Sequence, residues 1–211
     1  MAYRCVATSV AGFVQQLAVA YVANGYWFYV TGWIPPGKSP EDVDRKLIDR
    51  YGIDVSKWTR CRRKKAGLAN VQYLRHDRFF VLLATHGAHP FFAAEGKLVR
   101  DIRRQPLHFM GYSVSCRKGR NGLTWHPSVR IERECFRELK SHLTAKAVRC
   151  STDELTSELR SLPFEPYAPV RDQLRTLRRA VNRSRQAAGL EPVPAEVMRR
   201  RRRPVKPFDP P

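Results

Sequence analysis

This sequence contains a long stretch without charge, since no Asp, Glu, Lys or Arg occurs from Cys5 to Gly37. Such a stretch belongs in a protein core or in a membrane. A membrane-spanning helix needs about 20 mainly apolar residues in a row, whereas the glutamine pair at 15–16 and the Asn-Gly pair at 24–25 divide this stretch into shorter pieces. A signal peptide is also not recognisable. We therefore expect a buried helix followed by a buried strand, and no membrane partner.

Hydrophobic spacing and turn signals predict helices that alternate with strand pairs. Helices are expected at 9–23, 40–51, 56–65, 90–103, 132–148, 152–162 and 169–188, with strands at 26–34, 69–75, 78–85, 106–116 and 123–131. This order predicts an α+β fold, in which an antiparallel sheet of two hairpins is covered on one side by helices. A C-terminal basic helix and a disordered basic tail complete it. The expected divisions are an α+β body at 1–150, a helical segment at 151–190 and a Pro/Arg-rich tail at 191–211.

Charge predicts the class of partner. The formal net charge is +20, and 29 of the 39 cationic residues are arginine. A compact protein with this charge repels itself unless a polyanion shares the charge. Guanidinium groups fork onto phosphate and stack on flat rings, which ammonium groups do less well. We therefore expect a nucleic-acid-binding protein, with RNA or single strands slightly favoured over duplex DNA.

Three arginine-rich segments supply the candidate phosphate contacts. They are a cluster at 60–65, the helix at 169–188, and a tail with five consecutive arginines. The candidates are Arg60, Arg62, Arg63, Lys64, Lys65, Arg171, Arg175, Arg178, Arg179, Arg183, Arg185, Arg199, Arg200, Arg201, Arg202 and Arg203. In the helix, apolar residues fall on one side and arginines spread over the other. A solvated face is the alternative, but such faces usually mix both signs of charge, and Asp172 is the helix's one acid.

The strand at 26–34 offers a possible stacking surface. Trp27, Tyr29 and Trp33 alternate along it and share one side. Bases stacked on such rings contribute about 1–3 kcal/mol each, which favours single-stranded or looped nucleic acid. The alternative is that these rings belong to the core, and their charge-free surroundings favour that interpretation.

Histidines and tyrosines are the remaining candidates for chemistry. Two-metal hydrolysis needs several converging carboxylates, but only three acids occur between positions 55 and 131. Walker A, GxGxxG, GxSxG and HExxH motifs are absent from the sequence. The alternative function is a nuclease or strand-transfer enzyme that uses His or Tyr within 73–112. The residues concerned are Tyr73, His76, His86, His89, His108 and Tyr112. We assign none of them as catalytic, and we assign no metal ligand and no cofactor.

Cysteine spacing predicts the compartment. The five cysteines form no CxxC pair, which is typical of reduced thiols in a cytoplasmic protein. An accessory protein of a mobile element or of a ribonucleoprotein, working within a larger nucleoprotein assembly, would fit these features. The sequence leaves open the choice between RNA and DNA, the target and the oligomeric state.

Overall fold

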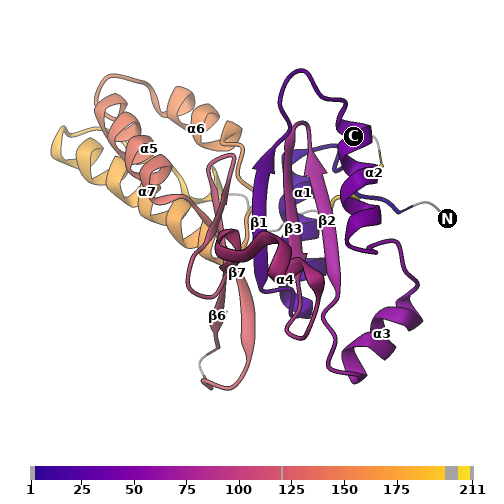
Figure 1. The fold of residues 1–211 in the computed structure, drawn as a ribbon. Helices are drawn as coiled ribbons and strands as arrows, with labels where there is room; N and C mark the ends of the chain where they lie inside the picture. The colour runs from indigo at the N-terminus through magenta and orange to yellow at the C-terminus, as the bar shows by residue number, and fades with distance from the viewer. Residues whose placement is uncertain (1–2, 120, 198–203, 210–211) are drawn as a thin grey trace. The chain divides into compact units, whose positions relative to one another are not determined.

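The computed structural model describes residues 3–119, 121–197 and 204–209 and confirms the α+β fold (Figure 1). The chain divides into two compact units. The first unit comprises Met1–Leu107, Val114–Ser128 and Val205–Pro211, and the second comprises His108–Ser113 and Val129–Pro204. The two expected hairpins lie in separate antiparallel sheets, one with strand order β2-β3-β1-β4 and one with order β5-β6-β7.

The four-stranded sheet forms the centre of the first unit. It contains β1 (Phe28–Trp33), β2 (Val71–His76), β3 (Phe79–Ala84) and the two-residue β4 (Arg100–Asp101). The β2–β3 hairpin turns at Asp77, whose φ of 49° lies in the left-handed region that Asp tolerates. Strand β3 pairs antiparallel with β2 on one side and with β1 on the other. Strand β1, which comes from the charge-free stretch, pairs with β3 and with β4, so it also lies in the interior of the sheet.

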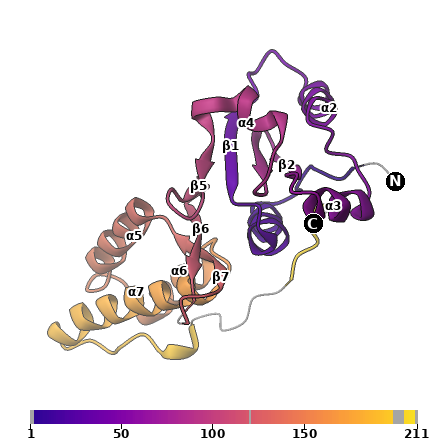
Figure 2. The same cartoon turned by 60° about the horizontal axis from the view of Figure 1, so that its bottom comes forward.

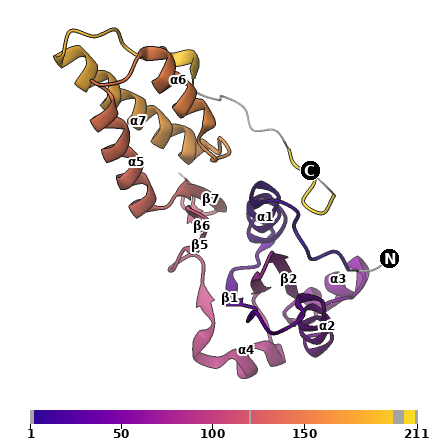
Figure 3. The ribbon, with the colours of Figure 1, turned by 90° about the horizontal axis from the view of Figure 1, so that it is seen from above.

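Helices cover both faces of this sheet, so the expectation of cover on one side was wrong. Figure 3 shows α1 (Val10–Gln15) on one face, and α2 (Pro40–Arg50) and α4 (Pro90–Glu95) on the other. On the α1 side, the rings of Phe13 and Phe79 pack 5.8 Å apart. The reason is that β3 is apolar on both its alternating faces, and a sheet that is apolar on both faces must be covered twice.

The charge-free stretch begins with a helix, as predicted. After α1 the chain continues through a π-helical segment, Gln16–Tyr21, and a 3₁₀ turn, Val22–Asn24, before Gly25 ends it with a φ of 91°. Glycine adopts this left-handed conformation without steric cost. In the described part of the chain, no helix combines the length and apolar character needed to cross a membrane.

Serine caps start several helices where the sequence predicted them. Ser39 accepts a backbone N–H at the start of α2, and Ser56 does so at the start of α3 (Lys57–Lys65). Ser151 and Glu154 form a reciprocal capping box at the start of α6 (Thr152–Ser161). These caps satisfy N–H groups that have no partner within the helix.

The second unit is mainly helical. Its α5 (Arg133–Lys146) packs along α7 (Ala168–Ala187) (Figure 2), and α6 lies beside them (Figure 3). The buried residues include Leu143, Leu155, Leu159, Val170, Leu174, Leu177 and Val181. The three-stranded sheet, made of β5 (Leu107–Phe109), β6 (Tyr112–Lys118) and β7 (Trp125–Ile131), has residues in both units.

The C-terminal segment 204–209 differs from the disordered tail that we expected. The side-chain amide of Gln15 accepts from the backbone N–H of Val205 at 2.9 Å and donates to its carbonyl. The Thr8 N–H donates to the Pro207 carbonyl at 3.0 Å. Arg4 and Asp209 form an ion pair at 3.2 Å. These contacts hold the segment against α1, whereas the arginine run at 199–203 lies outside the described residues.

Candidate nucleic-acid interface

The basic cluster predicted at 60–65 occupies most of helix α3. The side chains of Arg62, Lys64 and Lys65 are exposed, and those of Arg60 and Arg63 are half-buried. Arg63 donates from Nη1 to the Gly52 carbonyl at 3.2 Å. Four of the five predicted residues lie in the last turn of the helix. There they interact favourably with the negative end of the helix dipole.

The α7 helix presents a stripe of three arginines: Arg175, Arg179 and Arg183. Their side chains are exposed and follow one another at one-turn intervals of about 6 Å along the helix axis. Arg175 forms an ion pair with Asp172 at 2.7 Å. Across the described residues, no carboxylate pairs with the other two. Like charges at this spacing destabilise a helix slightly, so the stripe does not serve the helix itself.

An open pocket of about 530 Å³ borders this stripe. Its lining residues are Thr176, Arg179, Asn182, Arg183 and Gln186. Two guanidinium groups therefore stand beside hydroxyl and amide groups on one exposed surface. Such a surface can bind phosphate oxygens with both charge and hydrogen bonds.

Arg185 does not belong to this surface, so its assignment as a phosphate contact is corrected. Its side chain is buried, with 3% of the residue exposed. The guanidinium donates to the Ala147 and Cys150 carbonyls at 2.8 and 2.9 Å and to the Thr152 hydroxyl at 2.8 Å. It also donates to the Glu191 carbonyl. All these acceptors lie in the second unit. Arg185 therefore connects α7 by hydrogen bonds to the C-terminal end of α5, to the start of α6 and to the segment after α7.

Arg171 and Arg178 are intermediate cases. Arg171 donates to the Pro166 carbonyl and Arg178 to the Val193 carbonyl, both at 2.9 Å. Each side chain is half-buried. Some of the donors of each guanidinium therefore bind carbonyl groups of the second unit. Carbonyl groups do not neutralise the positive charge, so both charges can still attract an anion.

The three aromatic residues of the first strand have three different environments. Tyr29 is core, with 1% exposed, and donates its hydroxyl to the Gln105 and Pro106 carbonyls. Burial raises the pKa of this hydroxyl. Trp33 is 67% exposed and packs on Phe79 at one edge, with ring centroids 5.4 Å apart. The core interpretation therefore holds for Tyr29 and does not for Trp33.

Trp27 belongs to a stack that the sequence did not reveal. Its ring lies 6.0 Å from that of Trp125, and the Arg103 guanidinium lies 4.4 Å from the Trp27 centroid and 5.4 Å from the Trp125 centroid. Asp101 fixes Arg103 through hydrogen bonds of 2.7–3.1 Å. Burial works to raise the pKa of Asp101, but Arg103 outweighs it and lowers that pKa. No local pattern links positions 27, 103 and 125.

A second missed aromatic residue is Trp58 on α3, which is 77% exposed. A sequence signal was present here, because this tryptophan follows Lys57 and lies two positions before the basic cluster at 60–65. Exposed aromatic residues among cations are typical of nucleic-acid surfaces.

The tyrosine candidates for chemistry are interior residues with satisfied hydroxyls. Tyr73 donates to Asp44 at 2.5 Å, and burial together with this carboxylate raises the pKa of Tyr73. Tyr112 donates to the Pro163 carbonyl at 3.1 Å and accepts from the Glu165 N–H at 2.8 Å. Neither hydroxyl is exposed to a substrate in this arrangement.

The histidine candidates do not converge on one site. His89 accepts the Phe91 N–H at the start of α4, and His76 lies 2.8 Å from the Ala7 carbonyl. His86 and His108 are exposed. Over the residues that the structure describes, no three His, Cys, Asp or Glu side chains lie together as metal ligands would.

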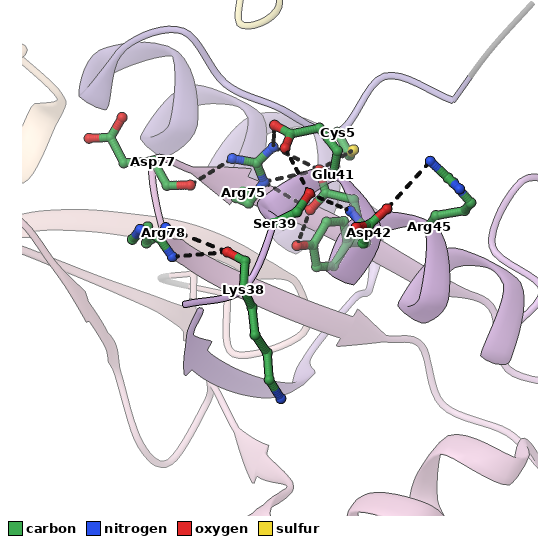
Figure 4. Close-up of polar contacts among 11 residues, drawn as sticks. Cys5, Lys38, Ser39, Glu41, Asp42, Arg45, Arg75, Asp77 and Arg78 are labelled. Carbon is green, nitrogen blue, oxygen red and sulfur yellow. Dashed lines mark hydrogen bonds and ion pairs between the residues drawn. The ribbon is translucent and has the colours of Figure 1, made fainter. Parts of the chain in front are cut away.

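A network of buried charged and polar groups lies in the first unit (Figure 4). Arg75 donates from Nε and Nη2 to the Asp44 carboxylate at 2.8–3.0 Å, and from Nη1 to the Asp77 carbonyl at 2.7 Å. Asp44 also accepts from Tyr73. Burial, followed by the charge of Asp44, raises the pKa of the neighbouring Cys5 thiol to about 12. The donors and acceptors of the network are paired internally, so it offers no open group for chemistry.

Comparison with known proteins gives no further guidance, since no family model, curated protein or solved structure matches this chain.

Proposed function

We propose that this chain is a cytoplasmic nucleic-acid-binding protein that grips phosphates through the α7 stripe (Arg175, Arg179, Arg183) and the basic helix α3. The α7 stripe carries the proposal, because two of its three guanidinium groups have no carboxylate partner in the described part of the chain. A phosphate backbone supplies the missing negative charges and gains counterion release in doing so. All five cysteines are free thiols, which supports a reducing compartment.

The direct test is a salt titration of binding to labelled RNA and DNA. Each phosphate neutralised lowers the logarithm of the affinity by about 0.7–0.9 per tenfold increase in salt. We expect the affinity of the double variant Arg179→Gln/Arg183→Gln to depend less steeply on salt, because two phosphate contacts are lost. The magnitude of the slope should fall by about 1.4–1.8 relative to the native chain. The measurement is fluorescence anisotropy at salt concentrations between about 50 and 200 mM.

The matched control is Arg149→Gln/Arg160→Gln, which removes two exposed arginines from the same unit. It changes the net charge equally but leaves the stripe intact, so its slope should stay near the native value. The proposal would be overturned if the affinity of the native chain for nucleic acid did not change with salt. An equal loss in both double variants would show that total charge, and not the stripe, is responsible.

A further inference from the structure

Helix α3 carries a large aromatic side chain in an unusual position. Trp58 is 77% exposed, although burying an indole is normally a major gain in folding. Among the described residues, no ring or guanidinium lies over it. By contrast, Trp33 packs on Phe79 and Trp27 on Trp125. The fold therefore leaves a complete aromatic surface open at Trp58.

The rest of α3 also contributes little to the core. None of its nine residues is fully buried, and an isolated helix of this length is marginal in water. It is held by the Ser56 cap, by the bond from Arg63 to the Gly52 carbonyl, and by the Asn70 side chain, which donates to the Arg60 carbonyl at 3.0 Å. Trp58, Arg62 and Lys65 take no part in these attachments.

Helical geometry places Trp58 among cations. Residues three, four and seven positions apart share a helix face, so Cys61, Arg62 and Lys65 lie on the same side as Trp58. All four are exposed. The helix contains six cationic residues and no acid, Lys57 to Lys65. An anionic partner would meet an aromatic ring with positive charge directly beside it.

We infer that α3 is a binding site for single-stranded nucleic acid, with an unpaired base stacked on Trp58 and the flanking phosphates held by Arg62 and Lys65. This inference rests on the proposed function and names the form of nucleic acid that the site selects. Bases in a duplex are already stacked on their neighbours, so only an unpaired base offers its face to the indole. The ring supplies selectivity for strand form, and the cations supply affinity.

A lipid surface is the competing partner for an exposed tryptophan among cations. A helix that lies in a membrane interface needs a broad apolar face to insert. In α3, Trp58 is the single large apolar residue, and Lys57 and Thr59 flank it. Charge without an apolar face favours nucleic acid over lipid.

The test compares the native chain with Trp58→Ala and Trp58→Phe on three labelled probes of equal length. These are a single-stranded oligonucleotide, the same strand with abasic sites throughout, and its duplex. We expect Trp58→Ala to weaken single-strand binding roughly 5- to 150-fold, the loss associated with one stacked ring. Its salt slope should be unchanged, because no phosphate contact is removed. Binding to the abasic and duplex probes should stay within about twofold, and Trp58→Phe should retain most of the single-strand affinity.

Controls separate this inference from folding and from the proposed function. The variant Leu98→Ala removes another exposed apolar side chain of the first unit, 64% exposed, and should bind like the native chain. Circular dichroism should show native melting for Trp58→Ala, because this side chain is not buried. Alkylation of the exposed Cys61 provides a second readout, and a bound single strand should slow it.

The outcomes distinguish two kinds of failure. If the native chain binds no probe, the proposed function fails and the inference fails with it. If the native chain binds but Trp58→Ala binds the single strand equally well, only the inference at α3 is overturned. The same holds if Trp58→Ala loses binding to anionic phosphatidylserine vesicles while oligonucleotide binding is unchanged.

Discussion

Individual arginines in this chain perform opposite tasks, and burial decides which. Arg75 and Arg185 have 5% and 3% of their surface exposed. Their donors are directed at carboxylate, carbonyl and hydroxyl acceptors of the protein. Arg179 and Arg183 are exposed. A guanidinium has five donors and no acceptor, so a buried one must be surrounded by oxygen atoms of the protein. An exposed one donates to water, which a phosphate oxygen can replace.

The Asp44–Arg75 pair can be tested by removing its carboxylate. Replacing Asp44 by Ala leaves the Arg75 guanidinium buried without its main counter-charge. Breaking a buried pair in this way costs about 3–5 kcal/mol of unfolding free energy. We expect Asp44→Ala to show that loss in urea unfolding followed by circular dichroism.

The double variant Asp44→Ala/Arg75→Met is the control for this prediction. It removes both charges and keeps an apolar side chain of similar length, so its loss should be smaller than that of Asp44→Ala alone. A loss below about 1 kcal/mol in the single variant would contradict a structural role for the pair.

Helix α4 is an element that begins at a titratable cap. His89 accepts the Phe91 N–H through Nδ1 at 3.1 Å, so that nitrogen must be unprotonated. Burial, followed by the charge of Arg63, lowers the pKa of His89 below its ordinary 6.5. The unfolded chain therefore binds this proton more readily than the folded chain. Stability should be complete above about pH 6.5 and should fall as the pH drops from there toward the lower folded-state pKa.

The variant His89→Asn isolates this effect, because Asn caps a helix and does not titrate. We expect its unfolding free energy to depend less on pH than that of the native chain between about pH 7.5 and pH 5.5. The other five histidines are present in both proteins, so they cancel in the comparison. Parallel pH profiles would show that His89 does not couple α4 to protonation.

The sequence predicted elements well where the signal is local. Ser39, Ser56 and Ser151 cap helices as expected, because a cap depends on a few adjacent residues. The pairing of β1 with β3 and the attachment of Val205 to Gln15 join distant positions. No short sequence pattern predicts these long-range contacts.

In the candidate site, too, the sequence predicted some residues correctly and missed others. The α7 helix shows the physical reason. At about 100° per residue from Val170, Arg175, Arg179 and Arg183 fall between about 140° and 220°, well away from the apolar side. Arg185 falls at about 60°, close enough to be drawn into the core. Helix angle was thus a usable signal that separates the exposed arginines from the buried one. The exposure of Trp58 could not be read from a helix angle, since it depends on where α3 attaches, and its cationic neighbours were its one sequence signal.

Charge acts on the molecule as a whole, and its effect can be measured without any ligand. The net charge of +20 makes the folded state repel itself, because folding brings like charges together. Salt screens this repulsion over a Debye length of about 10 Å at 0.1 M. It screens the buried Asp44–Arg75 pair far less, so the repulsive terms weaken more than the attractive ones.

We therefore expect the melting temperature to rise as sodium chloride is increased from about 0.05 to about 0.5 M. A gain of 1 kcal/mol corresponds to about 2–4 °C for a chain of this size. The variant Arg179→Glu/Arg183→Glu lowers the net charge by four units and should show a shallower rise, because less repulsion remains to be screened. The measurement is differential scanning calorimetry. A melting temperature that falls with salt would mean that surface ion pairs outweigh repulsion. In that case attractive ion pairs, and not the excess of positive charge, would control the stability of the folded chain, and self-repulsion would give no reason to expect a polyanion partner.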